Sequence, residues 1–320
     1  MNKFATKVNQ QVPVHKTVLL KESIEYLRPV EDGIYVDATV GLGGHSMQLL
    51  ETSDYRSQII GLDIDEEALM HAEQHLKPFK SQVTLVNKNF ADIDSVLMEL
   101  GVKKVNGIIA DLGMSSFQLE SNRGFSFSSN GPLDMRMDTN LQFTAFDLLH
   151  EMTEEEIEGL IRNYGEENFS KRISRSIVSA RKSRPLQTSA ELAEIVSDSI
   201  PKKFHPKGKH PATKTFQALR IAVNNEIENL KIFIEKAVEL LESGGRLIII
   251  SFHSLEDRVV KSHFRQLSLN CICPPDLPVC GCEKKSTLKI LTKSPVIPGR
   301  EELSENPRCR SAKMRIGERI

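Results

Sequence analysis

The sequence predicts an α/β fold: a Rossmann-like, mostly parallel sheet with helices on both faces and an all-helical domain inserted into it. Three observations support this. Short β-branched runs alternate with helical patterns in the first third, the middle reads as helices alone, and strand character returns near residue 245. Alternating strands and helices are typical of a parallel sheet, because each parallel connection needs a crossover.

The first part of the chain supplies four of the expected strands and two of the expected helices. The strands are apolar runs bounded by turn residues, at 34–39, 59–63, 83–87 and 105–111. Apolar residues at helical spacing lie between them, around Ala72 and Val96. Asp65 stands at the N-cap of the earlier helix, and we expect capping to be its only role.

A helical block follows, from about residue 147 to residue 229. Two capping boxes, Thr153 with Glu156 and Thr188 with Glu191, open helical stretches within it. Sheet character returns at 245–252, and two short runs at 288–291 and 313–316 are further candidate strands. We therefore expect residues 1–122 and 216–320 to form the sheet domain and residues 123–215 to form the inserted helical domain.

Composition and charge bound the protein's class. A chain of 320 residues is long enough for roughly two domains. Residues 1–16 lack the apolar stretch of a signal peptide, and no apolar run reaches the length of a membrane span, so we expect a cytoplasmic protein with no membrane partner. The formal net charge of −1 alone indicates no particular partner.

The charge is unevenly distributed along the chain. Residues 171–220 hold twelve Lys and Arg against three acids, a local net charge of +9, so the remainder carries −1 − 9 = −10. A segregated basic segment is typical of a polyanion-binding surface, and we favour nucleic acid as the partner. The alternative is a solvated helical face.

Four of the five cysteines lie within twelve residues, which is not the pattern of a secreted disulfide framework. They form two close pairs, Cys271 with Cys273 and Cys280 with Cys282. Four thiolates at this spacing can bind zinc. The alternative, reduced thiols in a surface loop, is the one we favour, so no metal is expected.

A glycine-rich turn follows the first expected strand, in Gly41-Leu-Gly43-Gly44-His45-Ser46. Glycines at this place let a ligand approach the backbone, and the next helix offers its unpaired N–H groups. A dinucleotide fingerprint needs a third glycine where Ser46 stands, and no Gly-Lys-Ser/Thr of a phosphate loop is present. The turn therefore favours a nucleoside cofactor such as S-adenosylmethionine over NAD.

Acids close two further strands. Asp63 ends the second strand, about twenty residues beyond the glycines, where an acid accepts hydrogen bonds from ribose hydroxyls. Asp111 ends the fourth, followed at once by Ser115, Ser116 and Gln118. The carboxyl ends of parallel strands line the ligand crevice, so we expect Asp111 to face both cofactor and substrate. Capping of a turn is the alternative role for such an aspartate.

At these residues the sequence resembles the bacterial 16S ribosomal RNA cytosine-N4 methyltransferase family, which depends on S-adenosylmethionine. The resemblance covers nearly the whole chain. It rests on long motifs: His15-Lys-Thr-Val-Leu-Leu, Asp37-Ala-Thr-Val-Gly-Leu-Gly-Gly-His-Ser, Ala110-Asp-Leu-Gly-Met-Ser-Ser, Arg123-Gly-Phe-Ser-Phe, Gly131-Pro-Leu-Asp-Met-Arg-Met-Asp, Tyr164-Gly-Glu-Glu, His210-Pro-Ala-Thr-Lys-Thr-Phe-Gln-Ala-Leu-Arg-Ile-Ala-Val-Asn and Ser251-Phe-His-Ser-Leu-Glu-Asp-Arg.

The resemblance implies methylation of a cytosine of the decoding region, cytosine 1402, with 16S rRNA or the small ribosomal subunit as partner. We also consider a homodimer of this chain as a candidate assembly. The helical insertion would then help to recognise RNA. The implied cofactor residues are Gly43, Gly44, His45, Asp63, Phe90, Asp111 and Gln118. Without the resemblance, Phe90 would be assigned to the core.

The exocyclic amine of cytosine is a poor nucleophile, so the enzyme must position and polarise it. We expect Asp111, or the hydroxyls of Ser115 and Ser116, to accept from the amine. The base must also be unstacked. The candidates to receive it are Phe125, Phe127, Asp134, Arg136 and Asp138, and packing is the alternative for the two phenylalanines. His253 is a candidate substrate contact, with a structural histidine as the alternative.

Two other enzyme classes and a binding protein compete with this hypothesis. An NAD-dependent oxidoreductase would need the missing third glycine. A non-catalytic RNA-binding protein would explain the basic segment but not the acids and glycines at strand ends. A methyltransferase acting on DNA or on another RNA shares the expected fold, and only the family resemblance argues against it.

Overall fold

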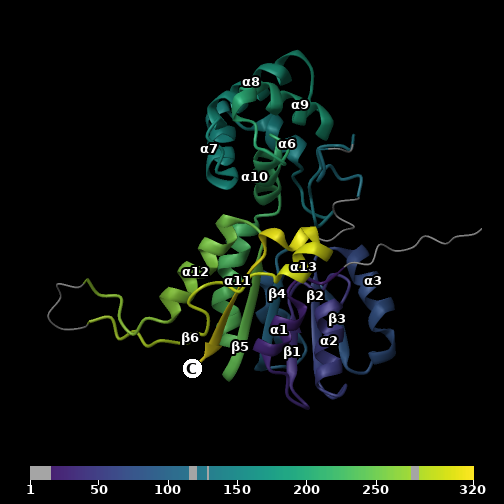
Figure 1. Ribbon diagram of the computed structural model, residues 1–320, viewed down its shortest axis with the longest axis vertical. Helices are drawn as coiled ribbons and strands as arrows, with labels where there is room; N and C mark the ends of the chain where they lie inside the picture. The colour runs from purple at the N-terminus through teal and green to yellow at the C-terminus, as the bar shows by residue number, and fades with distance from the viewer. Residues whose placement is uncertain (1–15, 115–120, 128–129, 275–280) are drawn as a thin grey trace, which may run out of the picture.

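The computed structural model describes residues 16–114, 121–127, 130–274 and 281–320. Its lower half is one seven-stranded sheet in the order β3-β2-β1-β4-β5-β7-β6 (Figure 1). The first five of these positions are parallel, and β7 runs antiparallel to both β5 and β6. The strands are β1 Ile34–Asp37, β2 Gln58–Asp63, β3 Val83–Asn87, β4 Val105–Asp111, β5 Leu241–Ser251, β6 Leu288–Ile290 and β7 Lys313–Arg319. All seven expected strands are confirmed, as is the mostly parallel sheet.

Helices cover both faces of this sheet, each burying an apolar stripe. One face packs against α4 Ile93–Glu99, α11 Glu226–Leu240 and α12 Ser254–Leu267. The other packs against α1 Leu20–Leu27, α2 Gly44–Thr52 and α3 Glu66–Leu76. A short helix, α13 Arg300–Glu305, and the 3₁₀ helices η1 Lys77–Phe79, η2 Phe90–Asp92 and η4 Pro307–Ser311 complete this part.

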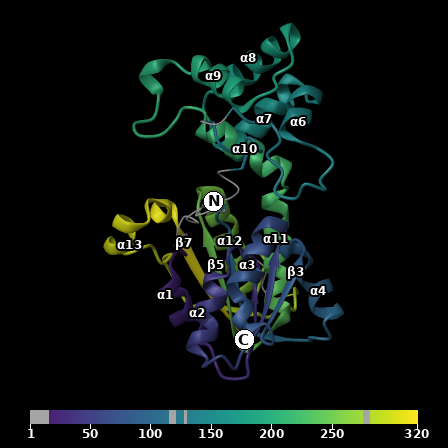
Figure 2. The ribbon, with the colours of Figure 1, turned by 90° about the vertical axis from the view of Figure 1, so that its right-hand side faces the viewer.

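The helical block stands above the sheet with a hydrophobic core of its own (Figures 1 and 2). It contains α6 Ala145–Glu151, α7 Glu154–Gly165, α8 Ser170–Ser183, α9 Ser189–Ser199, η3 Lys202–Phe204 and α10 Thr213–Val223. The two expected capping boxes are confirmed at Thr153 and Thr188. α10 packs into this core and continues past residue 215. The division at 123–215 therefore stays a prediction.

The two halves meet through α10 and α11, which follow one another along the chain (Figure 2). The block lies over the edge of the sheet where β5 ends, because Phe252 and His253 share a cleft with residues of α7 and α10. Among the described residues, no helix is both long enough and apolar enough to cross a membrane.

Candidate functional site

The strand order reverses direction between β1 and β4, whose neighbours on either side are β2 and β5. In open α/β sheets, ligands bind at such a switch point, outside the carboxyl ends of the strands. Asp37, Asp63 and Asp111 are the last residues of β1, β2 and β4. Three carboxylates thus converge on one edge of the sheet, beside the glycine-rich turn.

The turn after β1 needs its glycines for two different reasons. Gly41 and Gly43 have φ of 51° and 81°, in the left-handed region that side chains rarely adopt. Gly44 opens α2, and a Cβ there would lie 1.9 Å from the hydroxyl of Thr17. The turn therefore presents bare backbone and the N-terminus of α2, which is the arrangement expected for a ligand-binding turn.

Asp63 is tied to that turn. Its carboxylate accepts from the backbone N–H groups of Gly41 and Asp65, each at 3.0 Å. Burial raises the pKa of Asp63 to about 6, against the lowering effect of these hydrogen bonds. Because each carboxylate oxygen has two lone pairs, the group retains capacity to accept from ribose hydroxyls.

Asp111 holds the end of β4 in place and carries the most perturbed carboxyl of the three. Its N–H donates to the Thr39 hydroxyl at 2.7 Å, and its Oδ1 accepts from the Gly113 N–H at 3.1 Å. Burial raises the pKa of Asp111 to about 7, and the nearby charges of Asp37, Glu256 and Glu302 act in the same direction. A carboxyl poised near neutrality at a ligand crevice is a functional-site candidate.

Asp37 is a site residue that the sequence analysis did not assign. Its carboxylate accepts from the Ser46 hydroxyl at 2.7 Å, which joins the end of β1 to α2. Burial raises the pKa of Asp37 to about 6. The serine that removes the dinucleotide fingerprint therefore has a second role, since its hydroxyl holds the buried acid at the base of the turn.

The other expected cofactor residues lie around the same turn. His45 is buried in the first turn of α2, and its Nε2 lies 3.2 Å from the Val18 carbonyl. Phe90 opens η2 just beyond β3, and its ring packs edge-on against Phe233 with centroids 5.2 Å apart. Ser115, Ser116 and Gln118 lie outside the described residues, as does Cys280.

Asp65 caps α3, as expected, by accepting from the N–H of Glu67. The expectation that it does nothing else is wrong. The Arg123 guanidinium donates to the second oxygen of Asp65 at 2.9 Å, and both side chains are largely buried. The same guanidinium also donates to the carbonyls of Arg136 and Met137. Arg123 therefore ties the loop leading into the helical block to the sheet domain.

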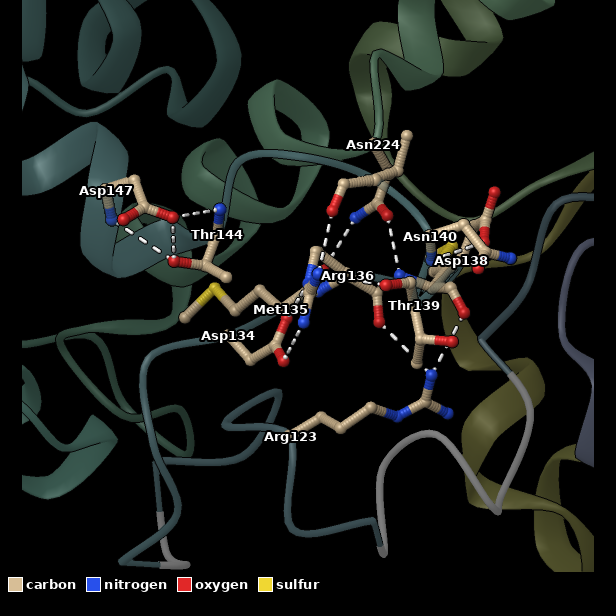
Figure 3. A network of polar contacts seen from close by, with 12 residues as sticks. Arg123, Asp134, Met135, Arg136, Asp138, Thr139, Asn140, Thr144, Asp147 and Asn224 are labelled. Atoms are coloured by element: carbon tan, nitrogen blue, oxygen red, sulfur yellow. Dashed lines mark hydrogen bonds and ion pairs between the residues drawn. The ribbon is translucent and has the colours of Figure 1, made fainter.

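The motif at 131–138 forms a polar network with the end of α10 (Figure 3). The Asn224 side chain accepts from the Met137 N–H and donates to the Met135 carbonyl. Arg136 binds Asp134 through two nitrogens and also donates to the carbonyls of neighbouring residues. Asp134 and Arg136 are thus committed to holding this loop.

The two phenylalanines of the preceding motif pack within the helical block. Phe125 is buried in its core beneath the Arg123 guanidinium. Phe127 stacks on His210, with ring centroids 4.4 Å apart, and meets Phe216 edge-on. The structure thus gives both rings the packing role that sequence analysis offered as the alternative. Asp138 accepts from the Asn140 N–H in the adjoining turn.

His253 begins α12 in a capping box with Glu256, which accepts from the N–H groups of Phe252 and His253. His253 Nε2 lies 3.0 Å from the Glu256 carboxylate. Both residues lie beside Glu226, which receives two hydrogen bonds from the partly buried Arg220. His253 therefore has structural partners here, and it also lines the cleft above the sheet.

That cleft has a volume of about 690 Å³ and lies between the sheet domain and the helical block. Its walls come from the α7–α8 turn, the start of α10, the end of β5 and the segment before β7. Glu166 in its wall accepts from Arg258 at 2.6 Å and also binds Ser254, linking the two halves. The cationic residues lining it are Lys209, Lys214, Arg310 and Lys313.

Fewer cations of the basic segment, residues 171–220, are available to bind a polyanion than its charge count indicates. Four of its twelve cations form ion pairs with acids: Arg175, Arg184, Lys214 and Arg220. Arg181 donates to two main-chain carbonyls. The cleft also includes cations that are distant in sequence, Arg310 and Lys313, which charge counting in a window cannot find.

Comparison with known proteins places this geometry in a family. The model of the MraW methylase family matches residues 13–320. A "Ribosomal RNA small subunit methyltransferase H" of Clostridioides difficile is 46% identical over 307 residues, covering 96% of this chain and 99% of its own length. Proteins of the same name from Halothermothrix orenii and Clostridium botulinum are 47% and 48% identical, with the same 96% of this chain covered.

The match extends over nearly the whole length of each of these relatives as well as of this chain. It confirms the expected enzyme class, a methyltransferase that uses S-adenosylmethionine, and the resemblance on which that expectation rested. The carboxylates at the strand ends and the glycine-rich turn are thus parts of a methylase. The chain belongs to the MraW methylase family.

Proposed function

We propose that the protein methylates the N4 amine of a cytosine in 16S rRNA, at position 1402 of the decoding region, from S-adenosylmethionine. Family membership and relatives named as small-subunit rRNA methyltransferases support the substrate. The observation that carries the site is Asp111: a partly buried carboxyl at the switch point of the sheet, with its pKa raised to about 7. The ribosomal substrate would place the protein in the cytoplasm.

The cofactor would lie across the β1–α2 turn, between the ends of β2 and β4. In this proposal the backbone at Gly43, Gly44 and His45 holds its amino-acid part, and the Asp63 carboxylate accepts from the ribose hydroxyls. Phe90 would border the adenine, with Gln118 as a further contact. When bound, S-adenosylmethionine supplies an activated methyl group on a positively charged sulfur.

That positive charge bears directly on Asp111. An adjacent cation favours the ionised carboxylate and would lower the raised pKa of Asp111. The carboxylate could then accept a hydrogen bond from the N4 amine, which localises the lone pair on nitrogen as it attacks the methyl carbon. Asp111 or solvent would take up the proton that the amine loses when the methyl group is transferred. The hydroxyls of Ser115 and Ser116 are the alternative acceptors.

The RNA would enter through the cleft between the two halves. Four cations line it; Lys214 pairs with Glu167 and Lys313 pairs with Asp257, while Glu166 on its wall is engaged with Arg258. Phe252 and His253 lie at its floor, next to the turn after Asp111, since a Cβ on Gly113 would lie 2.9 Å from the Phe252 ring. The helical block, predicted at 123–215, would thus recognise RNA while the sheet domain holds the cofactor.

A single assay tests the reaction. Labelled S-adenosylmethionine is offered with small ribosomal subunits, naked 16S rRNA and DNA, and the modified nucleosides are identified by mass. We expect N4-methylcytidine in rRNA, lost when the subunits already carry the modification. Label in DNA alone, or at another atom of the RNA, contradicts the proposal. The same samples, analysed by sedimentation, show whether the enzyme acts as the homodimer that we allow for.

The cleft is tested separately by RNA binding. Replacing Lys209 and Arg310 by alanine should weaken binding and lower the slope of log Kd against log salt, by ~0.7 for each phosphate of a single strand that the protein no longer neutralises. The matched control is Lys104→Ala. Lys104 lies beside α11 and does not line the cleft. An unchanged salt dependence in the double variant would exclude this face as the RNA surface.

A further inference from the structure

The cysteine-rich loop between α12 and β6 has no part in the proposed reaction. It projects beyond the sheet edge formed by β6, which β5 and β7 separate from the site at β4 (Figure 1). Its two ends are joined where the Thr287 N–H donates to the Leu267 carbonyl, and the Ser286 N–H to the Asn270 side chain. The loop therefore leaves and returns at one point.

Three sulfur atoms meet inside this loop. The Sγ atoms of Cys271, Cys273 and Cys282 all lie within 4.8 Å of one another. The Sγ atoms of Cys271 and Cys282 are 3.8 Å apart, far beyond a disulfide bond of about 2.05 Å. Zinc binds thiolates at about 2.3 Å in a tetrahedron, whose sulfur–sulfur edge is therefore about 3.8 Å.

Main-chain N–H groups also donate to these sulfur atoms. The Cys273 N–H points to the Cys271 sulfur, and the Ile272 N–H points to the Cys282 sulfur, each at 3.4 Å. Such N–H groups stabilise negative charge on sulfur and orient it, as the outer partners of metal ligands do. Two cysteines separated by one residue, with main-chain donors to sulfur, are thus arranged as thiolate ligands.

The loop has little else to hold its shape. Among its described residues, 268–274 and 281–287, none is buried, and Ile272 is 62% exposed. A segment without an apolar core generally needs a covalent or metal cross-link to adopt one conformation. The geometry therefore favours a cross-link through sulfur, and the sulfur spacing selects a metal over a disulfide.

We propose that Cys271, Cys273 and Cys282 bind one Zn²⁺ ion that fixes this loop. On binding, the three thiols lose their protons to solvent, three S–Zn bonds form and a water molecule completes the tetrahedron, with no change of oxidation state. Thiolate ligands favour zinc over hard cations such as Mg²⁺. The site is structural because it lies outside the cofactor turn and the cleft. It revises our expectation that this chain holds no metal, and it does not depend on the proposed reaction.

Metal content of the full chain, purified without added metal or an affinity tag that binds metal, tests the site in the absence of RNA and cofactor. We expect one zinc per chain. Loss of an outer partner alone weakens metal binding ~10–100-fold, so Cys271→Ser and Cys282→Ser should each lower zinc affinity by at least that factor. Cys309→Ala is the matched control, because Cys309 is buried in the sheet domain and should leave zinc unchanged.

The unaltered protein provides a second readout. Iodoacetamide should modify Cys271, Cys273 and Cys282 only after a strong chelator removes the metal, and Co²⁺ added back should give the absorption of a tetrahedral cobalt thiolate. Metal far below one ion per chain, iron in place of zinc, full zinc in both serine variants, or a mass loss of two hydrogens marking a disulfide would each overturn the proposal. Loss of zinc from the two serine variants, with normal methyl transfer, would agree with both the zinc site and the proposed reaction.

Discussion

Carboxyl groups at the strand ends of the sheet and carboxyl groups at the helix N-termini of the helical block behave in opposite ways. At the edge of the sheet, burial raises the pKa of three of them, to about 6 for Asp37 and Asp63 and to about 7 for Asp111. In the helical block, hydrogen bonds at helix N-termini lower the pKa of three others: Asp147, Glu156 and Glu191.

The difference separates groups that serve a site from groups that serve the fold. A carboxyl whose pKa is raised by folding costs stability when it ionises, whereas one whose pKa is lowered contributes stability. Acids with a raised pKa at a crevice therefore indicate chemistry, and acids with a lowered pKa at helix caps indicate helix stabilisation. Neutral substitutions should affect activity in the first set and stability in the second.

The largest effect is expected from Asp111→Asn. Asparagine can still accept a hydrogen bond, but it has no negative charge and cannot take up the amine proton, so kcat should fall ~10²–10⁴-fold, in the range of general-base contributions. Stability should hold or rise, because the substitution removes a buried group that is costly to ionise. Turnover and thermal denaturation measure the two effects. The control is the same substitution at Asp94, which lies on α4 away from the site. Near-normal turnover would exclude Asp111 from the reaction.

Arg123→Ala should come next, because it removes the guanidinium from the buried Asp65 carboxylate. Breaking a buried ion pair typically costs ~3–5 kcal/mol. The exposed pair of Arg162 and Glu158 is the matched control, and Arg162→Ala should cost ~0–1 kcal/mol. Urea denaturation gives both values. Equal losses would show that Asp65 gains nothing from Arg123 beyond its capping role.

The pH dependence of stability should then differ between Asp111→Asn and the unaltered protein. The pKa of Asp111 is raised from its ordinary value of 3.8 to about 7, so its protonated form stabilises the fold at low pH. That contribution is lost as pH rises from about 4 to about 7. The variant should therefore gain stability relative to the unaltered protein between pH 5 and pH 8, on the order of 1–3 kcal/mol. Parallel profiles by urea denaturation would contradict the raised pKa.

The smallest effect is expected in the helical block. Thr153 caps α7, and its N–H and hydroxyl lower the pKa of Glu156. Thr153→Ala should cost ~1 kcal/mol in unfolding free energy and leave turnover unchanged. Thr153→Ser keeps the hydroxyl and serves as the control. A loss of activity without a loss of stability would reverse the distinction drawn between the two halves.

Sequence patterns are sufficient for elements whose cause is local. Each of the seven strands overlaps a run in which the sequence predicts or offers a strand, and the capping boxes at Thr153 and Thr188 form as expected. The acids that close strands are predictable for the same reason. In a parallel sheet their carboxyl ends meet at one edge whatever the rest of the chain does.

Contacts between distant segments are not predictable in this way. The Arg123–Asp65 pair joins residues 58 positions apart, whereas the sequence pattern assigns Asp65 capping alone. Charge counting in a window also overestimates the basic segment, because several of its cations pair with acids on neighbouring helices. Phe125 and Phe127, candidates to receive a base, pack into the helical core.

By itself, the sequence determined the order of strands and helices, the turn at Gly41–His45 and the family to which the chain belongs. Only the tertiary structure decided how the two halves meet, because the cleft takes its walls from α7, α10, the end of β5 and Arg310 near the C-terminus. It also brought together three sulfurs on either side of a loop. Backbone periodicity acts over a few residues, whereas burial and ion pairing depend on which surfaces the fold places in contact.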